Sequence, residues 1–94
     1  MITEVNDLVR LFKAVANKRR VEILRLLLTE GEKNVSEVAQ RLEISFVSAS
    51  RHLLQLERVG LLKNYQKSFW VYYSVNDGPS SEVKALLQII ELKL

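Results

Sequence analysis

The feature that most constrains the fold is a change of apolar periodicity at Gly60. Before this residue, apolar side chains recur every three or four positions in several segments, which is the spacing of one helix face. After it, the segments 61–65 and 69–75 are rich in branched and aromatic residues, which predicts two strands of a β-hairpin. The chain therefore combines a helical first part with a small sheet. The helices expected from the spacing cover residues 4–16, 18–30, 35–42, 46–59 and 80–93.

Polar residues and glycines mark the ends of these segments. Asn17 and Ser45 precede two of the helices and suit N-caps, because their short side chains can accept hydrogen bonds from free helical amides. Asn34 with Glu37 has the spacing of a capping box. The hairpin turn lacks Asn-Gly or Asp-Gly, so we expect a loop of three or more residues there.

The third and fourth helices are separated only by a tight turn around Glu43–Ser45, which predicts a helix-turn-helix. The hairpin follows the second of these helices directly, in the position of a wing. The predicted fold is mainly α with a small β-hairpin, a winged helix-turn-helix of order α-α-α-α-β-β-α. With 94 residues, the chain is expected to form a single domain over residues 1–94.

The composition argues against catalysis and metal binding. The chain has no cysteine and one histidine, His52, so it lacks a thiol nucleophile and offers few soft metal ligands. We expect no catalytic residue, no metal site and no cofactor. For His52, a hydrogen-bonded packing role, a DNA contact and a pH sensor remain open. No apolar stretch is long enough for a membrane span and no signal sequence precedes the first helix, so a cytoplasmic location without membrane contact is expected.

Basic charge is concentrated on the fourth helix and the hairpin. Between Ser45 and Ser68 the chain has four basic residues and one acidic residue, against a net charge of +3 for the whole sequence. Such a concentration on a helix-turn-helix and its wing favours contact with double-stranded DNA. Residues that share the outward side of the fourth helix, together with a basic residue at the hairpin tip, are the candidate DNA contacts: Ser45, Phe46, Val47, Ser48, Arg51 and Lys67.

A second basic run, Lys18-Arg19-Arg20, begins the second helix, where cations oppose the helix dipole. Two explanations remain open. One is a phosphate at the flank of the site, and the other is solvation with Arg20 reaching a carboxylate.

The first and last helices have more apolar residues than one core contact needs. Leu11 lies outside the main stripe of the first helix. One interpretation is that both helices only pack on a small core, and the other is a two-fold dimer interface, which would place two reading helices side by side. The residues expected in that interface are Val5, Leu8, Phe12, Val83, Leu86, Leu87 and Ile90.

Four segments of the chain resemble the ArsR/SmtB winged-helix repressors: AVANKRRVEILRLLL (14–28), VSEVAQRL (35–42), SRHLLQLERVGLL (50–62) and WVYYSV (70–75). The resemblance implies a prokaryotic homodimeric transcriptional regulator that leaves its operator when an effector binds. Metal-sensing members carry a Cys-x-Cys where this chain has Asn34 and Ser36, and others carry histidine in the last helix, which has none here. The resemblance therefore implies a member without the usual metal sites. It also marks Ser68 as a departure, since glycine is common at that position of the wing.

The sequence thus predicts a homodimeric repressor that binds a palindromic operator and responds to an unidentified effector. The alternative is a winged-helix module for protein contact, in which Phe46, Val47 and Leu54 form an apolar docking patch.

Overall fold

The computed structural model describes residues 4–76, 78 and 80–92. It contains five helices and three strands among those residues. In chain order they are α1 (Val5–Val15), α2 (Lys18–Glu30), β1 (Lys33–Asn34), α3 (Val35–Leu42), α4 (Phe46–Arg58), β2 (Leu62–Lys67), β3 (Trp70–Val75) and α5 (Ser81–Leu92). The predicted winged helix-turn-helix order is confirmed, and most helix ends lie within a residue or two of their expected positions.

The helices begin at the caps that the sequence predicts. The Asn17 side chain accepts a hydrogen bond from the Arg20 amide at 3.2 Å, and both bonds of the Asn34–Glu37 capping box form. Gly31 follows the end of α2 with a φ of 83°, a left-handed value that favours glycine. These local bonds satisfy backbone groups that helix ends leave without partners.

The sheet has one strand more than the sequence predicts. Its order is β1-β3-β2 and all neighbours are antiparallel, with Asn34 opposite Tyr72. The short β1 pairs with β3 just before α3 begins, and so joins the helix-turn-helix to the wing. Two residues are too few to show a strand period, and for this reason β1 was not predicted.

The expected loop of three or more residues in the hairpin is wrong. Lys67 pairs with Trp70, so only Ser68 and Phe69 connect β2 to β3. Ser68 has a φ of 58°, which a two-residue hairpin turn requires but which is usually supplied by Gly or Asn.

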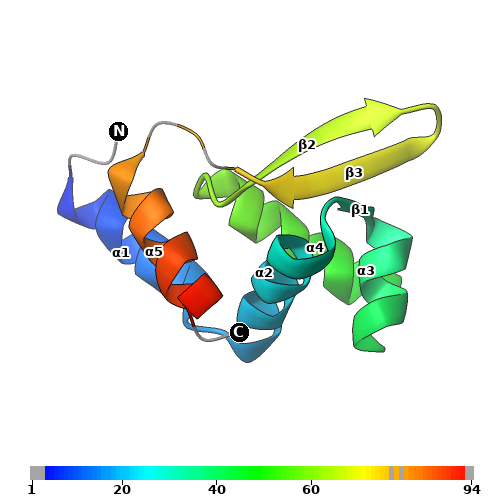
Figure 1. Ribbon diagram of the computed structural model, residues 1–94, viewed down its shortest axis with the longest axis horizontal. Helices are drawn as coiled ribbons and strands as arrows, with labels where there is room; N and C mark the ends of the chain where they lie inside the picture. The colour runs from blue at the N-terminus through cyan, green and yellow to red at the C-terminus, as the bar shows by residue number, and fades with distance from the viewer. Residues whose placement is uncertain (1–3, 77, 79, 93–94) are drawn as a thin grey trace.

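The core lies where α2, α4 and the start of β2 meet (Figure 1). On α4, Ala49, Leu53 and Leu56 form the inward face and are fully buried. They pack in one cluster with apolar residues of the neighbouring elements, which include Ile23, Leu24, Leu27, Val38, Leu61, Leu62 and Tyr73. The orientation of the reading helix is therefore fixed by its buried face.

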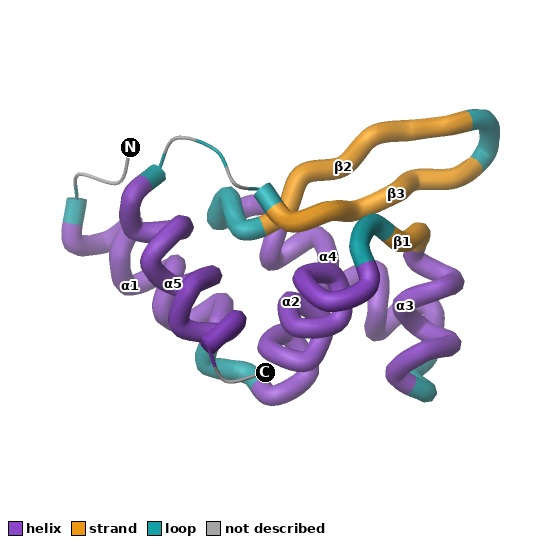
Figure 2. The backbone as a smooth tube through the Cα atoms, in the orientation of Figure 1, coloured by secondary structure: helices purple, strands orange, loops and turns teal. Residues whose placement is uncertain are grey.

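Helices α1 and α5 lie side by side at one end of the molecule, and α3 and the hairpin lie at the other end (Figures 1 and 2). From α1, the core receives Leu11 and Ala14. Leu11, which lies outside the main apolar stripe of that segment, is thus the large apolar side chain that α1 buries. Val5, Val9 and Phe12 are exposed instead. Within the described part of the chain, no helix is long and apolar enough to cross a membrane.

Candidate nucleic-acid interface

The turn between α3 and α4 is closed by backbone and side-chain hydrogen bonds. Glu43 ends α3 in the left-handed conformation with a φ of 55°, and the Ile44 amide donates to the Ala39 carbonyl at 3.0 Å. The Ser45 hydroxyl then accepts from the Ser48 amide at 3.0 Å and caps α4. Ser45 thus acts first as a cap, and its hydroxyl proton remains able to donate to another group.

The outward face of α4 combines apolar and basic side chains. Phe46 and Val47 are 56% and 65% exposed, and Arg51 is exposed one turn further along. Among the described residues, Arg51 forms no ion pair with a carboxylate. Ser48 is half-buried, so it contributes less surface than its neighbours.

A hollow of about 370 Å³ lies along this face. It is lined by Phe46, Val47, Ser50, Arg51, Leu54, Gln55 and Arg58. The structure thus brings the predicted α4 residues Phe46, Val47 and Arg51 together around one surface. It extends that surface toward the end of the helix through Gln55 and Arg58.

The wing projects away from the helices (Figure 2). Tyr65 and Tyr72 are opposite each other and stack at a centroid distance of 5.6 Å, which stiffens the hairpin. The Tyr65 hydroxyl also donates to Glu32, so the wing is bonded to the segment before α3. Lys67 is exposed at the end of β2. It therefore lies on a different element from the other predicted contacts.

The tip of the wing is aromatic, which the periodicity of the sequence does not indicate. Phe69 is 94% exposed, because it belongs to the turn and not to a strand. In the sequence Phe69 directly precedes the apolar residues Trp70 and Val71, so it looks like the first residue of the strand. A large apolar side chain at the tip adds to the surface that the wing presents beside Lys67.

His52 lies at the edge of the core, where its Nδ1 accepts a hydrogen bond from the Arg20 Nε at 3.3 Å. Burial lowers the pKa of His52, and the nearby charges of Arg20, Arg51 and Arg19 lower it further. The neutral ring, with its proton on Nε2, is the form that can accept this bond. The hydrogen-bonded packing role considered for His52 is confirmed.

Of the two explanations open for the basic run, the one in which Arg20 reaches a carboxylate is not borne out among the described residues. Besides His52, its guanidinium contacts the Ala14 carbonyl at 3.5 Å. Arg19 forms the ion pair instead, with Glu22 at 3.0 Å. Arg20 is thus positioned by neutral acceptors and keeps its charge uncompensated.

The residues that would occupy the usual metal positions have structural roles or face solvent. Asn34 is buried and used in the α3 capping box, whereas Ser36 is exposed. Among the described residues, no group of three or more His, Cys, Asp or Glu side chains could hold a metal ion.

The structure divides the residues expected at a dimer interface into three groups. Val5 and Phe12 are 76% and 51% exposed, and Leu8, Leu86 and Ile90 are half-buried. Val83 and Leu87 are buried in the core of the single chain. Val83 and Leu87 therefore offer little contact area to a second copy of the chain. The exposed residues of α1 offer more.

Comparison with known proteins identifies the family to which this geometry belongs. Residues 17–64, which run from the α2 cap to the wing, match the model described as bacterial regulatory protein, arsR family. The chain belongs to the arsR family of bacterial regulatory proteins. Members of this family are DNA-binding transcriptional regulators and not enzymes, and the chain is a DNA-binding regulator of this kind.

Individual relatives are similar to this chain in sequence. The transcriptional activator HlyU of Vibrio cholerae is 40% identical over 80 residues, which are 85% of this chain and 70% of HlyU. The arsenic resistance regulator ArsR1 of Pseudomonas putida is 38% identical over 82% of this chain and 60% of its own length. The chain thus spans less than two thirds of that relative.

Solved structures of relatives share the fold. The HlyU structure superposes with a TM-score of 0.78 at 38% identity, covering 97% of both chains. A homodimeric winged helix-turn-helix DNA-binding domain of Mb0332 from Mycobacterium bovis gives a TM-score of 0.79 at 26% identity. That match covers 99% of this chain and 89% of the other.

Proposed function

We propose that the chain is a single-domain, homodimeric repressor that reads a palindromic operator with α4 and its wing. The observation that carries this proposal is the outward face of α4, where Phe46, Val47 and Arg51 line one hollow. These residues follow the N-cap of the helix, Ser45. A recognition helix places residues of its first turns against base edges in the major groove. The exposed side chains lie in those turns.

Each candidate contact has a distinct role in this proposal. Arg51 donates to guanine with its guanidinium fork, and Phe46 and Val47 contact thymine methyl groups. The hydroxyl groups of Ser45 and Ser48 donate to a base edge or a phosphate at the start of α4. Lys67 follows the phosphate backbone from the wing.

The dimer is proposed to form through the end helices. Its support is the exposed stripe of Val5, Val9 and Phe12 on α1, together with Ile89, which is exposed on α5. The similar Mb0332 domain is described as homodimeric. A two-fold axis at this end would present two α4 helices to successive major grooves, and the operator would then repeat about one helical turn apart.

The proposal also states that the regulator represses transcription and does not sense a metal ion. Relatives include both the activator HlyU and arsenical repressors, so the family alone leaves the sign of regulation open. We favour repression because a dimer of this small domain acts most simply by covering its operator. Since Asn34 and Ser36 replace the cysteines of the usual site, its effector is not expected to be a thiophilic metal ion bound there.

The direct test is selection of bound sequences from a random duplex pool, followed by titration of the selected duplex. We expect two half-sites in two-fold arrangement. Arg51→Ala should weaken binding of the selected duplex by about 1–3 kcal/mol and relax the preference at one base pair. Lys67→Ala should lower the salt dependence with little change in sequence preference.

Lys84→Ala is the matched control, because Lys84 is an exposed cation of α5 outside the proposed contacts. If Arg51→Ala and Lys67→Ala both bind like this control, the placement of the reading surface is wrong. A selection that yields no repeated half-site would contradict the dimeric arrangement.

A second candidate function is a docking module for another protein, which the exposure of Phe46, Val47 and Leu54 favours. Random-sequence duplex at two salt concentrations separates the two functions. A DNA-binding protein loses affinity steeply with salt, because each neutralised phosphate releases counterions. A protein-docking module would bind duplex poorly at both concentrations.

A further inference from the structure

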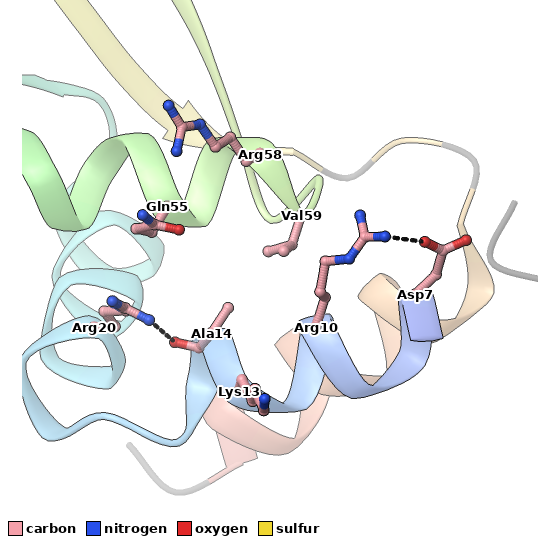
Figure 3. A pocket seen from close by; sticks show the side chains of 8 residues that line it. All are labelled: Asp7, Arg10, Lys13, Ala14, Arg20, Gln55, Arg58 and Val59. Atoms are coloured by element: carbon pink, nitrogen blue, oxygen red, sulfur yellow. Dashed lines mark hydrogen bonds and ion pairs between the residues drawn. The ribbon is translucent and has the colours of Figure 1, made fainter. Parts of the chain in front are cut away.

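A second hollow lies outside the surface assigned to base reading, between α1, the start of α2 and the end of α4 (Figure 3). Its volume is about 540 Å³. Arg10 and Lys13 line it from α1, Arg20 from α2, and Gln55 and Arg58 from α4. The sequence gives no sign of this cleft, because its residues come from three separate helices.

The cleft has more positive charge than its own carboxylate can balance. The acidic residue in the lining is Asp7, against the four cations of Arg10, Lys13, Arg20 and Arg58. Asp7 reaches Arg10 at 3.5 Å, and these side chains are 41% and 72% exposed, so solvent screens the pair. Neither Lys13 nor Arg58 forms an ion pair with any described carboxylate.

One of the cleft arginines, Arg20, is held in place by hydrogen bonds within the chain. Arg20 is held by the His52 ring at 3.3 Å and by the Ala14 carbonyl at 3.5 Å. In Figure 3 the guanidinium of Arg10 points from α1 into the gap toward α4, and Gln55 lies on the opposite side of the gap. Arginine side chains held in this way donate to oxyanions with little loss of conformational freedom.

We propose that this cleft binds a phosphate group. Guanidinium forks match the geometry of phosphate oxygens, and the Gln55 amide can add a neutral donor. Lys13 and Arg58, which also line the cleft, would attract the anion by their charge. The small side chains of Ala14 and Val59 leave the centre of the cleft open.

The phosphate has two possible sources, the DNA backbone and a small phosphorylated ligand. Gln55 and Arg58 line both this cleft and the hollow on the reading face, so the two surfaces are continuous along α4. A backbone phosphate beside the major-groove contacts would therefore reach the cleft, and this arm of the proposal rests on the proposed function. A small ligand would bind independently of it.

Inorganic pyrophosphate is the probe for the site itself. Titration of the full chain, followed by amide and arginine Nε–H chemical shifts, should move the signals of Arg10, Arg20 and Gln55. Arg10→Gln and Lys13→Gln should each raise the dissociation constant by roughly fivefold to tenfold, as expected for loss of one charge-assisted contact. Lys84→Gln, the matched removal of an exposed helical lysine, should leave it unchanged.

Random-sequence duplex identifies the source. If the DNA backbone is the ligand, Arg10→Gln should reduce the salt slope of duplex binding by about 0.9, and duplex should displace pyrophosphate. If a small phosphorylated molecule is the ligand, duplex binding of the variant should equal that of the parent while pyrophosphate binding falls. Either result supports the cleft.

The proposal is overturned if Arg10→Gln and Lys13→Gln behave like Lys84→Gln toward both pyrophosphate and duplex. This failure is distinct from failure of the proposed function, which Arg51→Ala and Lys67→Ala test at residues outside the cleft.

Discussion

Helices α1 and α4 both bury one face and expose apolar side chains on the other, but their exposed faces differ in charge. On α4, Phe46 and Val47 lie beside Arg51, which has no acidic partner among the described residues. On α1, the exposed stripe of Val5, Val9 and Phe12 is apolar, whereas the charged residues Asp7, Arg10 and Lys13 line the basic cleft. Exposed apolar area alone therefore does not identify a partner. The uncompensated cations make α4 suitable for DNA, whereas the α1 stripe suits a second apolar surface.

The largest expected effect tests whether α4 is fixed by its buried face. Leu53 is fully buried and the adjacent Leu54 is 40% exposed. Leu53→Ala should lower the free energy of unfolding by about 2–5 kcal/mol, because it leaves a cavity in the core. Leu54→Ala should change it by less than about 0.5 kcal/mol. Urea denaturation at a fixed protein concentration measures both, and equal effects would mean that α4 is rotated from the orientation described.

The next prediction concerns the exposed stripe of α1. Phe12→Glu places a carboxylate in the proposed dimer interface, where truncation of a central aromatic residue alone can cost about 2 kcal/mol. We expect the dissociation constant of the dimer to rise at least about 30-fold, as measured by sedimentation equilibrium. Phe46→Glu, on α4, is the control and should leave self-association unchanged. If the parent chain sediments as a monomer, the α1 stripe does not form a dimer interface. The proposed difference in partner between α1 and α4 would then be wrong.

A smaller effect is expected at the turn of the wing. Ser68 has a φ of 58°, and a left-handed conformation costs a non-glycine residue about 1–2 kcal/mol. Glycine removes this cost but loses more entropy on folding, so Ser68→Gly should raise the free energy of unfolding by up to about 1 kcal/mol. Ser74→Gly, within β3, should lower it by about 0.5–1 kcal/mol. The same sign for both glycine variants in urea denaturation would show that the turn is not strained.

Local signals account for most of the fold that could be predicted. The helix bounds follow from caps such as Asn17 and from apolar spacing, both of which act within a few residues. The inward face of α4 was predictable for the same reason. The strand β1 was not, because its two residues form a strand only through pairing with Tyr72 and Tyr73 far along the chain.

Features that depend on tertiary packing escaped prediction. Helix α1 has apolar residues on more than one side, and only its contacts with the rest of the chain decide that Leu11 faces inward and Phe12 outward. The candidate reading surface could be predicted from the sequence because its α4 residues lie on consecutive turns of one helix. The cleft of Arg10, Arg20 and Arg58 was not, since three helices must pack before these residues line one hollow.

The smallest expected effect is a pH dependence that arises where the core meets the basic surface. Burial, reinforced by the charges of Arg20, Arg51 and Arg19, lowers the pKa of His52 below the value of 6.5 expected in the unfolded chain. As pH falls below 6.5, the unfolded chain takes up a proton that the folded chain resists. The free energy of unfolding should then decrease, by less than about 1.4 kcal/mol per pH unit, until the folded pKa is reached. Above the unfolded value the stabilisation is fully present.

His52→Gln should remove this decrease between pH 7.5 and pH 5.5, since glutamine does not titrate. Glu30→Gln is the control, because hydrogen bonds from Arg41 and Lys33 lower the pKa of Glu30 below 4.5. Stabilisation by Glu30 is therefore lost only at lower pH, outside this window. If the difference in unfolding free energy between the parent and His52→Gln stays constant from pH 7.5 to 5.5, the pKa of His52 is the same in the folded and unfolded chains. The Arg20–His52 hydrogen bond would then contribute no pH sensitivity to the junction between the core and the basic cleft.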